Sequence, residues 1–367
     1  MDKLVIIGAN DFQNQLILRA KALGYETHVF AWEQGAAGKE TADRFYPISI
    51  IEKDEILGKC REITPVGVCS IASDLAAVTV NYVAEALGLP CNKTKYVPIQ
   101  TNKYLMRSAL TEAGIPCPRF VLAGDDFELS MIEGFSFPVI VKPTDRSGSR
   151  CVTKVGSAEE ILPAVRSAAA VSFEKRAVVE EFIPGDEYSM ETVTQNGSHH
   201  YLATTKKYTT GAPNFIETGH RQPSGLSKEI LQKAYGRIVG ALDALHVENS
   251  AAHSEFKVDN NGDAHIIEIG ARMGGDCIGS DLVYLSTGHD FMKMVIDIAV
   301  GNPIKLNPSP TENTVSVKFL FTPEDIDKMY AFRDAHPERI VRISQLELEN
   351  LGRTTDSASR VGYYIFR

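Results

Sequence analysis

The chain has 367 residues, of which 44% are hydrophobic and 23% are charged, and its formal net charge is −9. This composition is typical of a globular protein with two or three domains, and it contains no basic block, so we expect no nucleic-acid partner. No apolar run approaches the ~20 residues of a membrane span. The six cysteines lack Cys-x-x-Cys spacing, which predicts buried free thiols in a cytoplasmic protein.

Residues 1–95 alternate between short apolar strands and amphipathic helices. Strands are predicted at 4–7, 26–31 and 66–72, and helices at 12–23, 52–63 and 75–87. This order predicts a parallel, Rossmann-like sheet with right-handed crossovers. Gly8-Ala9-Asn10 lacks the Gly-x-Gly-x-x-Gly pattern, which argues against a dinucleotide. The crevice at the strand ends, near Asn10, Ser73 and Asp74, is a reasonable place for a small ligand.

The middle of the chain mixes both kinds of element. A helix with basic positions is predicted at 101–114, and another two at 158–170 and 228–245. The predicted strands lie at 138–143, 151–155, 177–183, 187–194 and 200–208. From about residue 302 the chain is Pro-rich, and short strands are expected to its end, in a small piece that packs onto the centre.

Residues 252–275 carry the most informative pattern. Two alternating flanks joined by Asn-Asn-Gly-Asp at 260–263 predict a β-hairpin. Glu255 and Glu268 lie at matching distances from this turn, so their carboxylates should face each other. Facing like charges are unfavourable unless a cation neutralises them, and Mg²⁺ favours one or two carboxylates plus substrate phosphates. The simpler alternative is that both glutamates face solvent.

Two further segments indicate a nucleotide site. Lys142 lies in an apolar strand before Ser147-Gly148-Ser149, a loop small enough to close its amides around a phosphate. The alternative for Lys142 is an edge-strand lysine in water. A second apolar strand delivers Glu180, and Glu187 follows a Pro-Gly turn. The backbone at 181–183 could then read an adenine edge, and Glu187 suits the ribose hydroxyls.

Together these features resemble the ATP-grasp ligases over roughly residues 1–300. The resemblance rests on Lys103, Lys142 with its small-residue loop, Glu180, Glu187, Glu255 and Glu268 in that order. It implies an α/β ATP-grasp fold with an N-terminal Rossmann-like (pre-ATP-grasp) domain at 1–95 and an ATP-grasp domain at 96–301. It also implies a mobile lid at about 117–181 and a small C-terminal α+β subdomain at 302–367.

The resemblance further implies ATP as ligand and Mg²⁺, or Mn²⁺ in its place, held by Glu255 and Glu268. The residues implied to contact ATP are Lys103, Lys142, Ser147, Gly148, Ser149, Glu180, Glu181, Phe182, Ile183, Glu187 and Lys207. Lys206 is as good a candidate as Lys207. Most ATP-grasp enzymes carry Asn two residues after the second metal Glu, whereas this chain has Gly270, which leaves one or two tightly held metal ions as alternatives.

Residues 214–224 and 269–275 are similar to the branch of bacterial L-amino acid ligases that includes the bacilysin-synthesising enzyme. There, Glu217, His220, Arg272 and Gly274 would line the substrate pocket, with Arg272 and Lys142 as the catalytic cations. Without the resemblance, His220 is equally well a structural histidine and Arg272 a partner in a surface salt bridge.

The implied activity is an ADP-forming ligase that joins a carboxylate to an amine through an acyl phosphate. The alternative is an enzyme like carbamoyl phosphate synthase, biotin carboxylase or the purine-pathway ligases, which activate bicarbonate or another small carboxylate. A non-catalytic nucleotide-binding protein is a third possibility, although all the expected lysines and carboxylates are present. The expected partners are small molecules and a second copy of the chain in a homodimer, with no nucleic acid and no membrane.

Overall fold

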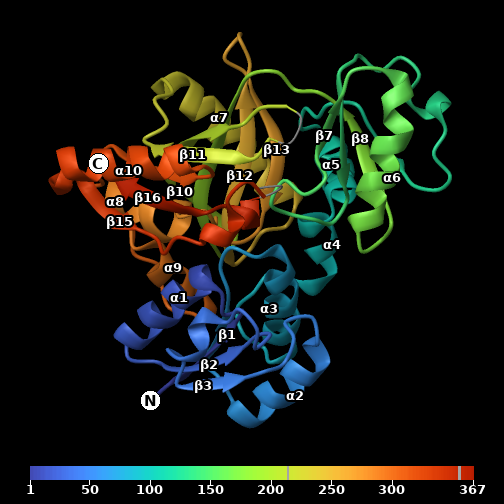
Figure 1. Cartoon of the computed structure of the whole chain (residues 1–367). Helices are drawn as coiled ribbons and strands as arrows, with labels where there is room; N and C mark the ends of the chain where they lie inside the picture. Colours follow the sequence, from blue (N-terminus) through green and yellow to red (C-terminus); the bar gives the residue numbers. More distant parts are fainter. Residues whose placement is uncertain (213–214, 354–356) are drawn as a thin grey trace.

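The computed structural model describes residues 1–212, 215–353 and 357–367, which form three sheets (Figure 1). We call them the N-terminal sheet, the small sheet and the large sheet. The N-terminal sheet lies at the bottom of Figure 1, and the small sheet lies beside the large sheet above it. This arrangement confirms the predicted α/β fold with a parallel N-terminal sheet.

The N-terminal sheet has the strand order β3-β2-β1-β4, and all its pairs are parallel. Its elements are β1 (Lys3–Ile7), α1 (Asp11–Ala22), β2 (Glu26–Phe30), β3 (Arg44–Tyr46), α2 (Lys53–Ile63), β4 (Gly67–Cys69) and α3 (Asp74–Ala86). Asn10 caps α1 in a capping box with Gln13, and Ser73 caps α3. Both helices therefore start at the carboxyl edge of the sheet, where the crevice was predicted.

Two short helices, α4 (Val97–Thr101) and α5 (Lys103–Glu112), lead into the small sheet. This sheet has the antiparallel order β5-β8-β6-β7 and is covered by α6 (Ile161–Val171). Its strands are β5 (Phe120–Ala123), β6 (Val139–Pro143), β7 (Thr153–Val155) and β8 (Ala177–Glu181).

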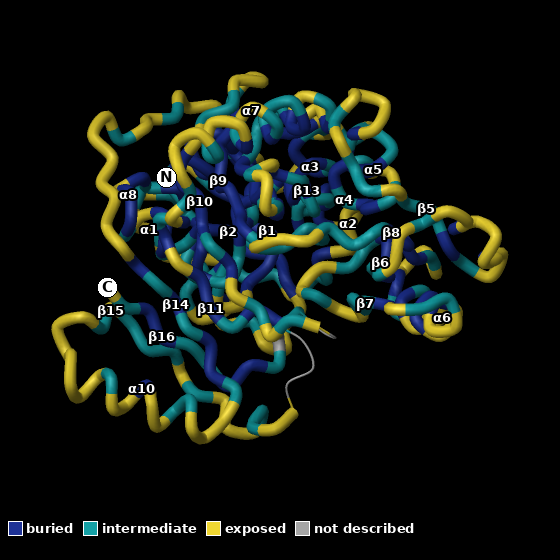
Figure 2. The backbone as a smooth tube through the Cα atoms, turned by 90° about the horizontal axis from the view of Figure 1, so that it is seen from above, coloured by how far each residue is buried: buried dark blue, intermediate teal, exposed yellow. Residues whose placement is uncertain are grey.

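The large sheet is antiparallel, in the order β13-β12-β9-β10-β11-β14-β16-β15. Its strands are β9 (Asp186–Gln195), β10 (Ser198–Thr209), β11 (Glu217–Gln222), β12 (Ser250–Val258), β13 (Ala264–Gly270), β14 (Val315–Leu320), β15 (Ile340–Ile343) and β16 (Gly362–Phe366). Figure 2 shows β9 and β10 buried at its centre, whereas α10 (Pro323–Ala335) and α6 lie at the periphery. The helix α7 (Lys228–Ala244) packs against β13 and β10.

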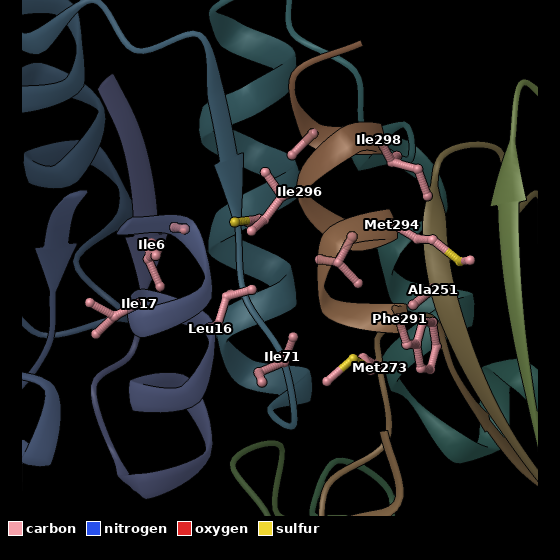
Figure 3. Close-up of a cluster of buried hydrophobic side chains, with 14 of the residues drawn as sticks. Ile6, Leu16, Ile17, Ile71, Ala251, Met273, Phe291, Met294, Ile296 and Ile298 are labelled. Carbon is pink, nitrogen blue, oxygen red and sulfur yellow. The ribbon is translucent and has the colours of Figure 1, made fainter. Parts of the chain in front are cut away.

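One apolar cluster joins the N-terminal sheet to the large sheet (Figure 3). The helix α9 (Phe291–Ala299) lies between them and belongs to the same core as Ile6 of β1, Ile17 of α1 and Ala251 of β12. Beside it, the N–H of Ala72 donates to the carbonyl of Met273 at 3.1 Å. This contact fixes the segment after β13 against the N-terminal sheet, close to the start of α3.

The structure differs from the sequence-based prediction in several elements. Residues 323–335 form the helix α10 where short strands were expected, because Thr322 and Asp325 form a capping box and Pro323 occupies its first turn. The C-terminal strands β14, β15 and β16 extend the large sheet. The short strands β3 and β11 and the helices α8 (Val283–Thr287) and α9 were not predicted.

Two chain-wide predictions can be compared with the structure. Among the described residues, no helix is long and apolar enough to cross a membrane. All six cysteines are free, and four are buried as expected. The expectation was wrong for the other two, because Cys117 is only half-buried and Cys151 is exposed in the loop before β7.

Candidate active site

A cavity of about 150 Å³ lies between the small sheet and the large sheet, and we call it the active-site cavity. Strands β6, β8, β9, β10, β11, β12 and β13 all contribute side chains to it. The residues from the predicted set that line it are Lys103, Lys142, Ser147, Gly148, Ser149, Glu180, Glu181, Phe182, Ile183, Glu187, Lys207, Glu217, Glu255, Glu268 and Arg272. Only His220 and Gly274 of that set lie outside the lining.

Glu180 is the centre of a buried ion-pair network on the small-sheet side. Its carboxylate accepts from Lys142 Nζ at 2.5 Å and from Arg107 Nε at 3.0 Å. Burial raises the pKa of Glu180, but the two cations outweigh burial and lower that pKa to about 2. Arg107 also donates to the carbonyls of Ile266 and Ile267. The network therefore ties α5 to both antiparallel sheets, and Lys142 has the anionic partner that its position required.

Lys103 connects the small-residue loop to the hairpin. Its Nζ donates to the carbonyl of Arg146 at 2.6 Å and pairs with Glu268 at 2.9 Å. Burial lowers the pKa of Lys103, but Glu268 outweighs burial and the net shift is upward. Gly148 and Ser149 both have positive φ, at +74° and +56°. The left-handed backbone at these two residues makes a tight turn, which the glycine adopts without a steric cost.

Lys207 on β10 is surrounded by three carboxylates. Its Nζ donates to Glu255 and lies 3.2 Å from Glu187 and 3.6 Å from Glu217. Burial lowers the pKa of Lys207, but these carboxylates hold it well above its usual value. Lys206 instead pairs with Asp186 at 2.7 Å and does not line the cavity, since successive residues of a strand point to opposite faces. Of the two lysines left open by the sequence, Lys207 is the one in the cavity.

The hairpin places Glu255 and Glu268 directly opposite each other, as the turn predicted. Both line the cavity, and a lysine neutralises each of them: Lys207 pairs with Glu255, and Lys103 with Glu268. Facing carboxylates with cavity space in front of them are the oxygen ligands that suit Mg²⁺ when substrate phosphates complete its shell. The residues fit the metal on this donor chemistry. Among the described residues, no group of three His, Cys, Asp or Glu forms a metal-binding cluster.

Arg272 is held by a residue of the N-terminal sheet's helix α3. Its Nε and NH2 atoms donate to the two carboxylate oxygens of Asp74 at 2.8 and 3.2 Å. Burial raises the pKa of Asp74, but the guanidinium outweighs burial and the net shift is downward. A two-point pair of this kind fixes the plane of the guanidinium. Asp74, named earlier only as part of a crevice, is therefore the residue that orients Arg272.

Gly270 leaves little space for a side chain. A Cβ placed there would lie 3.0 Å from Asp74 Oδ1 and 3.1 Å from Arg272 Cζ. The asparagine found at this position in most ATP-grasp enzymes would therefore press on the Asp74–Arg272 pair. The absence of a side chain at residue 270 therefore leaves room for the Asp74–Arg272 pair that orients Arg272.

Of the two predicted substrate residues on β11, Glu217 lines the cavity and His220 lies outside its lining. Glu217 accepts from Ser357 and Arg360 of the C-terminal segment, the latter at 3.0 Å. His220 is buried, and neither ring nitrogen has a hydrogen-bond partner among the described residues. Its Nε2 lies 3.9 Å from Asp276, which also pairs with Arg360. Burial lowers the pKa of His220. Sequence reasoning missed Arg360, because nothing local predicts that it reaches β11.

Gly274, the other predicted pocket residue, packs in the interior. A Cβ there would lie 2.8 Å from His253 Nδ1 and 2.9 Å from Glu191. His253 and Glu191 form a buried hydrogen-bonded pair. Burial lowers the pKa of His253, but Glu191 outweighs burial and raises that pKa to about 9. Asn214, at the start of the other predicted pocket segment, lies outside the described residues.

Residues 181–183, whose backbone was expected to bind adenine, already form hydrogen bonds within the protein. The N–H of Phe182 donates to the carbonyl of Pro138 at 3.1 Å, and Lys257 donates to the carbonyl of Ile183 at 3.2 Å. Lys154 and Lys257 also lie over the Phe182 ring, at 4.0 and 4.5 Å from its centroid. Lys257 lines the cavity, and sequence reasoning missed it.

Residues 135–281 match the ATP-grasp domain family. This match covers three of the four strands of the small sheet and the hairpin with its carboxylates. The central part of the chain is therefore similar to the ATP-grasp domain.

The chain is also similar to individual ligases. It is 29% identical to an alanine–anticapsin ligase of Bacillus subtilis over 65% of this chain and 57% of that protein. It is 25% identical to a D-alanine–D-alanine ligase of Pseudomonas putida, over 58% of this chain and 69% of that protein. The crystal structure of an L-amino acid ligase from Bacillus licheniformis superposes with a TM-score of 0.79, covering 100% of this chain and 93% of that one at 23% identity. The chain spans just over half the length of the alanine–anticapsin ligase it matches. The predicted resemblance to this branch is confirmed.

Proposed function

We propose that the protein is an ATP- and Mg²⁺-dependent, ADP-forming ligase that activates a carboxylate and couples it to an amine. One observation carries the proposal. The active-site cavity is lined by four lysines, among them the predicted Lys103, Lys142 and Lys207, together with two facing carboxylates and an oriented arginine. The names of the similar ligases support the same reaction class.

Glu255 and Glu268 would hold Mg²⁺, whose chemistry when bound is to neutralise and align the phosphates. Lys103, Lys142 and Lys207 would contact the phosphates of ATP, and the loop at Ser147-Gly148-Ser149 would close over them. Glu180, Glu181, Phe182, Ile183 and Glu187 would lie beside the nucleoside. Each of these side chains lines the cavity.

In the reaction, a carboxylate oxygen would attack the γ-phosphorus, and the bond to the β–γ bridging oxygen would break, giving an acyl phosphate and ADP. Such a transfer needs in-line positioning and charge neutralisation more than covalent help. Arg272 would grip the planar carboxylate. Its Nε and NH2 atoms pair with Asp74, which would hold the guanidinium in place while its remaining N–H groups bind the substrate carboxylate.

In the second step, an amine nitrogen would attack the acyl carbon, the C–O bond to phosphate would break, and the proton would leave with the phosphate. Water competes for an acyl phosphate, so closure of the site is expected. We propose that residues 117–181, which contain the small sheet, form the lid of an ATP-grasp domain at 96–301. An N-terminal domain at 1–95 precedes this domain and a C-terminal subdomain at 302–367 follows it. Glu217, His220, Gly274 and Arg272 would shape the substrate pocket.

The proposal is tested by measuring phosphate release from Mg·ATP. L-Amino acids are supplied singly and in pairs, and bicarbonate is supplied in a separate set of reactions. Release that requires two amino acids supports the ligase and names its substrates. Release with bicarbonate or another lone carboxylate would move the protein to the carboxylate-activating alternative. ATP binding without release under any condition would contradict catalysis.

The cytoplasmic location and the homodimer are also proposals; the first rests on the cysteine pattern and the second on the resemblance. Light scattering of the purified protein across a concentration series would test the dimer. A constant mass near 40.2 kDa would contradict it.

A further inference from the structure

A second cavity, of about 800 Å³, opens between the N-terminal sheet and the small-residue loop. We call it the interdomain cavity. It shares Lys103, Arg146, Ser147 and Glu268 with the active-site cavity. The two cavities therefore meet at the end where the phosphates of ATP are proposed to lie. A molecule in the interdomain cavity reaches the reacting groups through this shared end.

Large apolar side chains are exposed on two sides of the interdomain cavity. Trp32 follows β2, Ile51 precedes α2, and Phe173 follows α6 on the small-sheet side. Their exposed fractions are 50%, 51% and 58%. Exposed aromatic and branched side chains that line a concave site are favourable contacts for the apolar part of a ligand.

The N-terminal wall of the interdomain cavity carries no cation, and the cations that line this cavity, Lys103, Arg146 and Arg150, lie outside that wall. The lining residues from 8 to 78 include one charged side chain, Asp74, and no lysine, arginine or histidine. Amides at the starts of α1 and α3 already donate to the capping side chains of Asn10 and Ser73. This wall therefore lacks the cations with which proteins bind a phosphorylated group.

We propose that the interdomain cavity binds the amine substrate, and that this amine carries a large apolar or aromatic group against Trp32, Ile51 and Phe173. The inference rests on the proposed ligase function. Arg272, the residue that would grip the carboxylate, lines the active-site cavity and not the interdomain cavity. The carboxylate therefore belongs to the smaller cavity, and the larger one is left for the amine.

Trp32 is the single tryptophan of the chain, so its fluorescence reports on this cavity directly. The protein, with Mg²⁺ and a non-hydrolysable ATP analogue, is titrated with phenylalanine amide and with alanine amide. These amines differ only in the side chain, and neither has a carboxylate to activate. We expect phenylalanine amide to change the Trp32 emission and to bind at least tenfold more tightly in calorimetry. Equal affinities, or binding without a change in emission, would overturn the proposal.

Two variants sharpen the test. Ile51→Ser keeps the fluorophore and removes part of the apolar wall, so it should weaken binding of phenylalanine amide at least fivefold and leave alanine amide unaffected. Tyr284→Ser is the control, because Tyr284 is 58% exposed and lines neither cavity. Unchanged binding of phenylalanine amide in Ile51→Ser would count against the proposal, as would a preference for phosphoethanolamine over both amides.

Failure of this proposal is distinguishable from failure of the ligase function. If pairs of small amino acids release phosphate while phenylalanine amide neither binds nor inhibits, the ligase stands and the apolar amine site is wrong. If phenylalanine amide binds at Trp32 while no pair of substrates releases phosphate, the cavity binds apolar amines but the ligase function is wrong.

Discussion

At the scale of single residues, Arg272 separates the proposed ligase from a protein that only binds nucleotide. Arg272→Ala should lower turnover by about 10²–10³, which is the usual effect of removing one preorganised electrostatic group. The Kd for ATP should stay nearly constant, since Lys103, Lys142 and Lys207 remain. Arg342→Ala is a matched control, because Arg342 pairs with Asp281 and lines neither cavity. Near-normal turnover of Arg272→Ala with a folded circular dichroism spectrum would contradict the assigned role.

Gly270 gives a second test at this scale. Gly270→Ala should lower activity because its Cβ would press on the Asp74–Arg272 pair, and Gly270→Asn should lower it further despite the added metal-ligating group. Steady-state rates across a Mg²⁺ series would measure both. If Gly270→Asn were more active, or bound Mg²⁺ more tightly at full activity, the steric explanation of this departure from the family pattern would be wrong.

The ion pairs of Glu180 should also contribute to the free energy of unfolding. Its pKa is lowered from 4.5 to about 2, so its contribution is fully present above pH 4.5 and is lost as pH falls through about 2. Glu180→Gln leaves Lys142 and Arg107 unpaired and should cost about 3 kcal/mol at pH 7. Urea unfolding at several pH values should show this difference shrinking below pH 4.5. Glu62→Gln, an exposed partner of Lys59, should change little. A Glu180→Gln difference that is independent of pH would contradict the ion-pair account.

At the scale of elements, the small sheet should behave as a lid. We expect a non-hydrolysable ATP analogue with Mg²⁺ to slow hydrogen exchange at Ser147-Gly148-Ser149, because the loop amides would then bond to phosphate. The helix α10, remote from both cavities, serves as the internal reference. Unchanged exchange at the loop under saturating nucleotide would rule out its closure over the phosphates.

The hairpin shows what the sequence could predict. Its turn and alternating flanks are local signals, and they gave the correct Glu255–Glu268 register. The Asp74–Arg272 pair joins residues 198 positions apart and depends on how Met273 docks beside Ala72. Local patterns carry no information about such docking. The strand β11 was missed for another reason: Glu217–Gln222 contains no apolar residue, although it pairs with both β10 and β14.

At the scale of the whole molecule, the large sheet joins the site to the end of the chain. Arg360 reaches Glu217 from the C-terminal segment, and Glu217 in turn lies 3.6 Å from Lys207. The order of lysines and carboxylates was enough to predict the superfamily, because the fold brings these positions into one cavity. The roles of the C-terminal segment and of the interdomain cavity were not predicted, because both depend on packing between segments far apart in sequence.

The central claim is that a carboxylate is activated as an acyl phosphate, and oxygen transfer tests it most directly. The amino acid pair that supports phosphate release is supplied with ¹⁸O in the carboxylate of the acyl donor, and the released phosphate is analysed by mass spectrometry. The account predicts one ¹⁸O atom per phosphate, because the attacking carboxylate oxygen leaves with phosphorus when the amine displaces it. Phosphate that carries no ¹⁸O, released at the same rate, would contradict the proposed activation.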